Sequence, residues 1–292
     1  MRANVLVTGG SSPLGDIVLP QLVEVFGSVV ATTRSPRATD RIASAGAVPI
    51  ECDLREIPSL DLDADIVVHL AGINFGAAAV ALVRMTGANR LVAVSSASAT
   101  APWHPRREEV LAAEERLRQA DAITSIIRPT MIYGSPRERN VSRIVALCQR
   151  SPAVPRISGG GHLMPVFADD VASAIVELAQ ADSPLSLAPV SGPTPLTLGQ
   201  MVDAVCVVTK TRRLPLTAPL SAPIAVAKTI HDPRSKLIHA VQMLEVDRIV
   251  ETPAQAGFRF ASTDFESGVR AAIKRYPSGK RANRSSVGGY EG

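Results

Sequence analysis

Short hydrophobic runs separated by glycine and polar turns predict alternating strands and helices along the first half of this chain. Residues 4–8 form an apolar run that ends at a glycine pair, and runs with strand character recur at 28–33, 47–51, 65–70, 90–95 and 122–127. Largely apolar runs of this length are typical of buried parallel strands. Helical spacing lies between them at 16–26, 41–45 and 106–119, and Pro20 is expected to kink the first helix or shift its start. The alternation predicts an α/β fold, a doubly wound parallel sheet of the Rossmann-like kind.

The pattern changes near residue 135, where the alternation loosens and prolines become frequent. Helices are expected from Asp169 onward, at 198–209 and at 264–276. We therefore expect residues 1–134 to form an NAD(P)-binding domain. Residues 135–276 should form a smaller α/β substrate lobe interleaved with the main sheet, and residues 277–292 a basic flexible tail.

Charge adds little to this picture. The chain has 292 residues and a net charge of +4, and three of its cations, Lys280, Arg281 and Arg284, lie in the tail. A solvated tail explains them better than a nucleic-acid contact, because basic and aromatic residues are not interleaved elsewhere.

Cysteine use and hydropathy favour a cytoplasmic protein without a metal site. The three cysteines, Cys52, Cys148 and Cys206, are far apart in sequence and form no Cys-x-x-Cys pair, so neither a disulfide framework nor zinc is expected. Residues 66–83 carry no charge, but His69, Gly72 and Asn74 interrupt them. A strand, a turn and a buried helix fit this stretch better than a membrane span, and no leader segment is expected before the first strand.

The turn after the first strand has the composition of an anion-binding site. Gly9 and Gly10 lack a Cβ, so a diphosphate can approach the main chain, and the N–H groups of residues 14–17 are expected to point at it. Ser12 stands where the usual Gly-x-x-Gly-x-x-Gly spacing has its middle glycine. Its hydroxyl would donate to a phosphate oxygen, or its Cβ would push the ligand outward. The spacing predicts a dinucleotide pyrophosphate held by Gly9, Ser11, Ser12, Pro13, Leu14 and Gly15.

The end of the second strand indicates which cofactor is preferred. Arg34 and Ser35 follow that strand, Arg37 is close behind, and the first acid is Asp40. A cation suits the 2′-phosphate of NADP, whereas NAD needs a carboxylate for its ribose hydroxyls. NADP is therefore expected, with NAD as the alternative, against a reading in which the arginines only line a surface loop.

Other candidate contacts follow the remaining strands. Asp53 is placed to accept from an adenine amino group or to cap a following helix, while His69 is best explained as a satisfied core histidine. Further expected cofactor contacts are Leu54, Leu70, Ala71, Gly72, Ser95 and Pro129.

In this order and spacing the segments resemble the short-chain dehydrogenase/reductase superfamily, in its extended or atypical branch, the NAD-dependent epimerase/dehydratase family. The resemblance rests on Thr8-Gly9…Gly15, residues 52–54, residues 68–72, Val94-Ser95-Ser96, Arg128-Pro129…Tyr133-Gly134, residues 167–172, 257–260 and 266–270. It implies chemistry by Ser/Thr, Tyr and Lys. Ser96 fits the first position, but Arg106 and Val110 stand where the Tyr-x-x-x-Lys pair belongs. The first tyrosine of the chain is Tyr133 and the first lysine Lys210.

These residues leave several functions open. The first is an NADP-binding protein with atypical or no catalysis, acting as a cofactor sensor or regulatory partner. The second is an NADP-dependent oxidoreductase or sugar-nucleotide epimerase in which His104 or His162 supplies the proton. The third is a nucleic-acid-binding regulator that uses the tail. The partner is a small-molecule substrate or none, and a homodimer is less expected because the helix between His69 and Ser95 is shorter than the one that builds dimers in the family.

Overall fold

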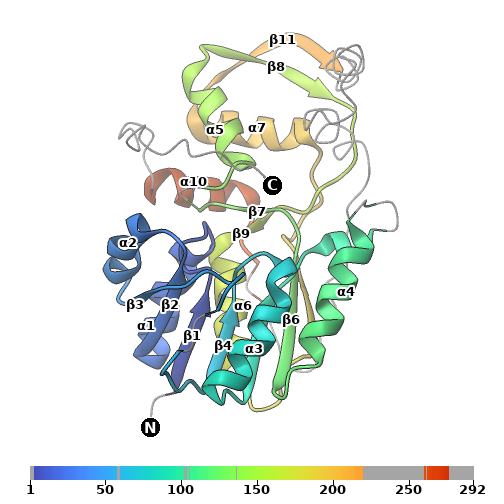
Figure 1. The fold of residues 1–292 in the computed structure, drawn as a ribbon. Helices are drawn as coiled ribbons and strands as arrows, with labels where there is room; N and C mark the ends of the chain where they lie inside the picture. Colours follow the sequence, from blue (N-terminus) through green and yellow to red (C-terminus); the bar gives the residue numbers. More distant parts are fainter. Residues whose placement is uncertain are drawn as a thin grey trace.

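A seven-stranded parallel sheet forms the centre of the protein, as seen in a computed structural model (Figure 1). The structure describes residues 3–57, 60–101, 104, 106–135, 137–219, 260 and 262–275. The strand order is β10-β6-β5-β4-β1-β2-β3. The strands are β1 (Asn4–Thr8), β2 (Ser28–Thr33), β3 (Val48–Glu51), β4 (Ile66–His69), β5 (Arg90–Val94), β6 (Ile123–Pro129) and β10 (Leu187–Val190). The winding reverses between β1 and β4, which confirms the predicted doubly wound sheet.

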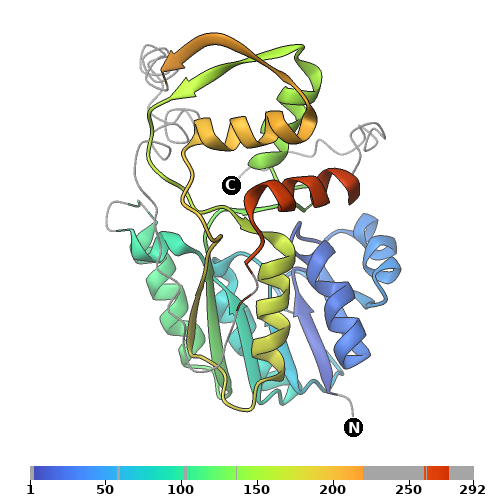
Figure 2. The ribbon, with the colours of Figure 1, turned by 180° about the vertical axis from the view of Figure 1, so that it is seen from behind.

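Helices cover both faces of this sheet. On one face α1 (Gly15–Phe26) packs against α6 (Ala168–Gln180), and on the other α3 (Gly76–Thr86) packs against α4 (Arg107–Arg118) (Figures 1 and 2). The short α2 (Thr39–Ser44) lies beside β3. Pro20 lies inside α1, so the helix begins before it and continues past it rather than starting late. All four residues of β4 are buried, as expected for a strand covered on both sides.

A smaller lobe lies over the carboxyl ends of the strands (Figure 1). It contains α5 (Val141–Arg150), α7 (Leu198–Thr209), α10 (Phe265–Arg275) and a parallel pair of strands, β8 (Ala153–Ser158) and β11 (Arg212–Pro219). Its buried residues form a core of their own that includes Tyr133, Phe167 and Phe265. The two-residue strands β7 (Ile132–Tyr133) and β9 (Val166–Phe167) pair where the chain passes between sheet and lobe.

The second half of the chain contributes to both parts. After α5 and β8, the chain returns to the main sheet with α6 and β10 before α7 joins the lobe. Asp170 of α6 is buried and accepts hydrogen bonds from the amide and hydroxyl of Thr263, at 2.7 and 2.8 Å, just before α10. These bonds hold the lobe's last described helix against α6.

Two sequence expectations on the rest of the chain have different outcomes. The strand, turn and helix predicted for residues 66–83 are present as β4, the short 3₁₀ helix η2 (Ile73–Phe75) and α3. None of the helices that the structure describes is both long and apolar enough to cross a bilayer. The basic tail at 277–292 and the 257–259 part of the family resemblance lie outside the described residues.

Candidate functional site

The glycine-rich turn lies at the point where the sheet reverses its winding, which is where ligands of such sheets usually bind. Residues 9–14 connect the end of β1 to α1. The Gly10 amide donates to the Thr32 carbonyl at 3.1 Å, so the turn lies against the end of β2. The Ser12 amide donates to the Gly9 carbonyl at 2.9 Å, which closes the turn. The turn is therefore fixed by its own backbone and by the neighbouring strand.

The three glycines of this turn are needed first by the fold. Gly9 has a φ of +71°, and a Cβ there would lie 2.7 Å from the Ala71 amide nitrogen. A Cβ on Gly10 would meet the Ala31 Cβ at 2.8 Å, and one on Gly15 the Gly10 carbonyl oxygen at 2.3 Å. The expectation that the missing Cβ atoms mainly admit a diphosphate is thus incomplete, because each also permits close packing of the protein itself.

The amides at the start of α1 are less free than the sequence predicts. The Gly15 amide donates to the Ser12 hydroxyl oxygen at 3.0 Å, the Asp16 amide to the Ser12 carbonyl at 3.3 Å and the Ile17 amide to the Leu14 carbonyl at 3.0 Å. The expectation that the amides of residues 14–17 point at a bound diphosphate is therefore wrong for Gly15, Asp16 and Ile17, whose partners are Ser12 and Leu14. Ser12 acts as a helix cap, and because its oxygen accepts from Gly15, its own proton remains available to a ligand.

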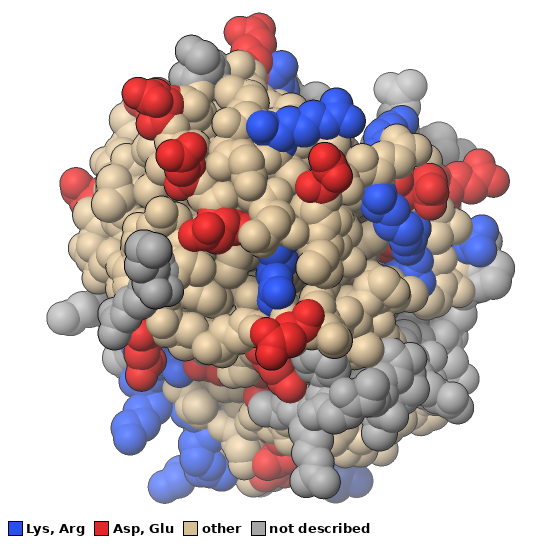
Figure 3. Space-filling view, turned by 90° about the horizontal axis from the view of Figure 1, so that it is seen from below, with Lys and Arg blue, Asp and Glu red and all other residues tan. Residues whose placement is uncertain are grey.

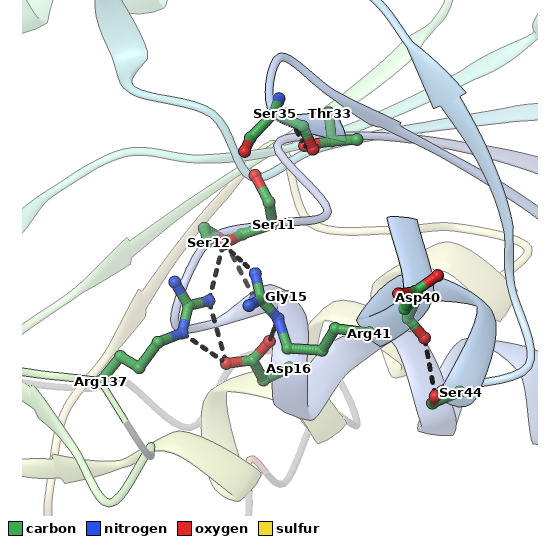
Figure 4. A network of polar contacts seen from close by, with 10 residues as sticks. All are labelled: Ser11, Ser12, Gly15, Asp16, Thr33, Ser35, Asp40, Arg41, Ser44 and Arg137. Carbon is green, nitrogen blue, oxygen red and sulfur yellow. Dashed lines mark hydrogen bonds and ion pairs between the residues drawn. The ribbon is translucent and has the colours of Figure 1, made fainter. Parts of the chain in front are cut away.

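Asp16, in the first turn of α1, is held between two arginines from distant segments (Figure 4). Arg41 of α2 contacts one carboxylate oxygen at 2.9 Å, and Arg137, between β7 and α5, contacts the other at 3.0 Å. Both guanidinium groups also donate to the Ser11 carbonyl, at 3.2 and 2.6 Å. The Asp16 side chain is only 8% exposed. Two cations against one carboxylate leave the turn with excess positive charge, which favours an anion there.

The loop after β2 presents Arg34 and Ser35 to solvent next to this turn. The Ser35 amide donates to the Thr33 hydroxyl oxygen at 3.1 Å, which shapes the loop. Figure 4 places Ser11 beside Thr33 and Ser35. Two polar loops thus meet at the carboxyl ends of β1 and β2.

Asp53 is held by Arg55 through both carboxylate oxygens, the shortest contact being 2.6 Å. These bonds, together with the Arg55 amide and the charges of Arg55 and Arg34, lower the pKa of Asp53 to about 2. Asp53 caps a turn rather than the helix considered from the sequence, because residues 54–55 form a turn. Asp53 follows the carboxyl end of β3, so it lies at the same edge of the sheet as the glycine turn. The charge of Arg34 acts on it there.

His69 is a core residue, as the sequence suggests, but it is not fully satisfied. Its Nδ1 lies 2.6 Å from the Thr8 hydroxyl, and the residue is completely buried. Its Nε2 has no partner of hydrogen-bonding geometry among the described residues. Burial lowers the pKa of His69 to about 4, and the Gly72 backbone opposes that shift. A neutral imidazole therefore joins the ends of β1 and β4.

A buried carboxylate organises the ends of β5 and β6. Glu114 of α4 is fully buried and accepts from the Ser95 hydroxyl at 2.5 Å. Arg128 of β6 pairs with both of its oxygens, at 2.8 and 2.5 Å. Ser96, one residue on, accepts from the Ser98 amide at 3.1 Å and the Ser98 hydroxyl at 2.9 Å. Ser96 therefore caps the 3₁₀ helix η3 (Ala97–Thr100), and these two bonds do not use its own hydroxyl proton.

The positions that the family resemblance assigns to tyrosine and lysine hold other chemistry. Arg106 is exposed and pairs with Glu109 at 2.9 Å, which raises its pKa further. Val110 is a buried apolar residue of α4. Tyr133 is fully buried, donates to the Phe265 carbonyl at 3.4 Å, and burial raises its pKa. None of these three groups is suited to proton transfer near neutral pH.

The two candidate histidines lie in loops. The Nδ1 of His104 accepts from the Arg106 amide at 3.2 Å just before α4, so its Nε2 carries the proton when the ring is neutral. His162 lies between β8 and β9 and is half-buried. Among the other expected contacts, Leu70 and Pro129 are buried, Leu54 and Ala71 are half-buried and Gly72 is exposed. Among the described residues no cluster of three or more His, Cys, Asp or Glu residues is arranged to hold a metal ion.

Sequence reasoning missed Asp16, Arg41, Arg137 and Glu114. The acid at 16 reads as an ordinary first-turn residue, and the arginines belong to segments without a motif. Glu114 has only helical spacing in its favour. Their importance comes from contacts between residues up to 126 positions apart in sequence, which no local pattern reports.

A hollow lies near the amino ends of the strands, at the edge of the sheet opposite the glycine turn. It has a volume of about 660 Å³ and is lined in part by Asn4, Asp65, Asn89 and Arg90. Arg90 uses one nitrogen to hold the carbonyls of Leu178 and Ala179 at the end of α6, at 3.3 and 2.8 Å. On this face, acidic and basic side chains are interspersed without a patch of one sign (Figure 3). Because Arg90 bonds to the last carbonyls of α6, it has a structural role as a helix cap.

No protein-family model matches the sequence, and no curated protein matches it. Solved structures do match the fold. UDP-glucose 4-epimerase from Thermotoga maritima is 16% identical, with a TM-score of 0.69 over 93% of this chain and 97% of that chain. UDP-glucose 4-epimerase from Thermus thermophilus, in complex with NAD, is 17% identical, with a TM-score of 0.67 over 94% and 99%. dTDP-glucose 4,6-dehydratase from Bacillus anthracis in complex with NAD is 14% identical, with a TM-score of 0.66 over 95% and 97%.

These comparisons define the class of fold. The fold of the chain is similar to that of UDP-glucose 4-epimerases and a dTDP-glucose 4,6-dehydratase over 93–95% of its length. The resemblance inferred from the motifs is confirmed at the level of the fold.

Proposed function

We propose that the protein binds a nicotinamide dinucleotide across the carboxyl ends of β1, β2 and β4, with NADP preferred over NAD. The observation that carries this proposal is the pairing of the glycine turn with the Arg34–Ser35 loop at the reversal of the sheet. Solved structures of the same fold hold NAD. Gly9, Ser11, Ser12, Pro13, Leu14 and Gly15 would hold the diphosphate, with Arg41 and Arg137 adding positive charge.

Arg34 supports the choice of NADP. It is exposed, and Asp53, which its charge reaches, is already neutralised by Arg55. The guanidinium of Arg34 can therefore pair with a 2′-phosphate. Asp53, Leu54, Leu70, Ala71, Gly72, Ser95 and Pro129 border the same edge and would contact the adenine and ribose parts of the ligand.

Removal of Arg34 should remove the selectivity. A charge-assisted bond contributes about 1.5–3 kcal/mol, so Arg34→Gln should weaken NADPH binding about 10- to 100-fold and leave NADH unchanged. Titration calorimetry with both cofactors measures this. Arg84→Gln, an exposed arginine on α3, is the matched control and should bind as the wild type does. Equal affinities of the wild type for the two cofactors would end the NADP proposal.

We further propose that turnover is absent or slow. Arg106 is ion-paired, Val110 is apolar and Tyr133 is buried, so the proton machinery of the family has no counterpart at those positions. A binding role as cofactor sensor or regulator follows. General acid–base catalysis typically contributes 10²–10⁴-fold, about 3–5 kcal/mol, which such a site would forgo.

A substituted catalyst is the second candidate, favoured by the geometry of His104. The Arg106 amide donates to its Nδ1 at 3.2 Å and so fixes the orientation of the imidazole ring just before α4. An imidazole held in this way is a suitable proton donor near neutral pH. The protein would then be an NADP-dependent oxidoreductase or a sugar-nucleotide epimerase.

A panel of sugar nucleotides and small carbonyl compounds with NADPH, followed at the nicotinamide absorbance, separates the two candidates. We expect rates far below about 1 per second. Ordinary enzyme rates that His104→Gln abolishes, while His162→Gln does not, would instead establish the substituted catalyst.

A further inference from the structure

Two of the three cysteines meet in the core of the lobe. Cys148 of α5 and Cys206 of α7 are 58 residues apart in sequence, and their sulfur atoms are 3.5 Å apart. They are 1% and 3% exposed. Both belong to the last turns of their helices, and the two helices pack against each other. The sequence shows only that the cysteines are far apart along the chain, and the fold brings two of these free thiols together.

The two sulfur atoms have different electrostatic surroundings. Arg213 of β11 donates to the Cys206 sulfur at 3.6 Å and also pairs with Asp203. A guanidinium at this distance stabilises negative charge on that sulfur. Burial, together with the hydrogen bond and charge of Cys206, raises the pKa of Cys148 to about 12, while Arg213 opposes the rise. Cys206 is thus the sulfur suited to attack, and Cys148 remains a thiol beside it.

Cys52 provides an internal contrast. It is buried at the end of β3, and both its burial and the charge of Asp53 raise its pKa. The charged neighbour of Cys52 is the Asp53 carboxylate, whereas the charged neighbour of Cys206 is the Arg213 guanidinium. Cys52 thus differs from Cys206 in its electrostatic surroundings and not in its burial, which makes it the internal control for the pair.

We infer that Cys148 and Cys206 form a dithiol site that a peroxide converts reversibly into an intramolecular disulfide. The Cys206 thiolate attacks one oxygen of hydrogen peroxide, the O–O bond breaks, and hydroxide leaves as a sulfenic acid forms. That hydroxide takes up the proton that Cys206 released on forming its thiolate, which gives the first water. The Cys148 sulfur then attacks the sulfur of the sulfenic acid, the S–O bond breaks, and the Cys148 proton passes to the departing oxygen. The S–S bond forms, and water leaves. In total, two thiols and one peroxide give a disulfide and two waters.

Disulfide formation requires only a small movement of the two sulfur atoms, which are 3.5 Å apart. A disulfide brings its sulfur atoms to about 2.05 Å, so they must move together by about 1.5 Å. Side-chain rotation in two terminal helical turns provides such movement. The bond would join α5 to α7 and close a loop of the lobe, independently of any cofactor at the sheet.

The wild-type protein provides the first test. After treatment with hydrogen peroxide in the folded state and unfolding under alkylating conditions, the chain should retain one reactive thiol. Peptide mapping should find that thiol on Cys52 and a peptide linked through Cys148 and Cys206. Dithiothreitol should restore all three. Three remaining thiols, or a bond involving Cys52, would overturn the assignment.

Variants test the order of attack. Cys52→Ser should form the bond as the wild type does. Cys148→Ser should leave a sulfenic acid on Cys206 that dimedone traps, whereas Cys206→Ser should leave Cys148 unlabelled. Equal labelling of both single variants would refute the asymmetry.

Arg213 is the positioning residue of this site. Arg213→Gln should slow disulfide formation about tenfold, by loss of a charge-assisted bond. The matched control is Arg212→Gln, because neighbouring residues of a strand face opposite sides. Circular dichroism verifies the fold of each variant, and if one does not fold, the peptide map of the wild type still decides the pairing.

Discussion

Single buried polar residues set much of the chemistry of this protein. His69 is held neutral between the ends of β1 and β4, with one nitrogen on Thr8 and the other without a good partner among the described residues. Glu114 is fully buried and bonded to Ser95, Arg128 and Arg118. In each case burial imposes a cost that only a specific partner offsets. For His69 the free-energy cost of burial depends on pH, because burial disfavours the protonated imidazole.

Stability should therefore fall in acid because of His69. Its pKa is about 4 in the folded protein and about 6.5 in an unfolded chain. Between these values the unfolded state binds a proton that the folded state excludes, so the free energy of unfolding decreases as pH falls from 6.5 to 4. It should be independent of this group above 6.5. The loss amounts to about 3 kcal/mol.

Urea unfolding across this pH range measures the effect. His69→Asn keeps a polar atom near Thr8 but does not titrate, so the variant should be less stable at neutral pH yet show a shallower decline in acid. Identical slopes for both proteins would show that His69 does not carry the pH dependence.

At the scale of elements, the turn between β1 and α1 depends on contact as much as on conformation. Gly9 and Gly87 both have positive φ values, +71° and +67°. A Cβ at Gly9 would collide with the Ala71 backbone, whereas a Cβ at Gly87, which ends α3, would meet nothing within 4 Å. Alanine substitutions at Gly9 and Gly87 therefore separate two costs in the free energy of unfolding. Both positions carry the cost of a positive φ, and only Gly9 adds the steric cost of a Cβ against the Ala71 backbone.

Gly87→Ala should lower the free energy of unfolding by about 1 kcal/mol, the cost of a left-handed alanine. Gly9→Ala should cost more, because β1 and β4 must also move apart. Chemical denaturation of both variants measures the difference. Equal losses would mean that the turn relaxes freely and that its glycines are there for a ligand alone.

At the scale of the whole molecule, the lobe and the sheet are tied together at the candidate site. Arg137 reaches from the segment before α5 to Asp16 and the Ser11 carbonyl, and Asp170 of α6 holds the segment before α10. Arg137 thus brings a residue from the path into the lobe against the glycine turn. The cofactor selectivity proposed for Arg34 and the disulfide proposed in the lobe concern opposite ends of this arrangement, so each can be tested without the other.

The sequence by itself determined the first six strands of the sheet, the helices that alternate with them and the glycine turn. These features depend on periodicity and on glycine within a few residues, which a sequence displays directly. The roles assigned to Ser96 and Arg34, and the loss of the tyrosine and lysine, stay predictions. The sequence misjudged the amides of α1, because the Ser12 cap is a matter of side-chain geometry, and it left the helix-capping role of Asp53 open.

Only the tertiary structure decided that β10 completes the sheet, that Asp16 joins Arg41 to Arg137, and that Cys148 meets Cys206. Each of these brings together residues separated by tens of positions or more. Such contacts arise when layers pack, and their partners carry no shared local pattern. The physical reason is that short-range propensity selects elements, whereas burial and charge pairing between elements select their neighbours.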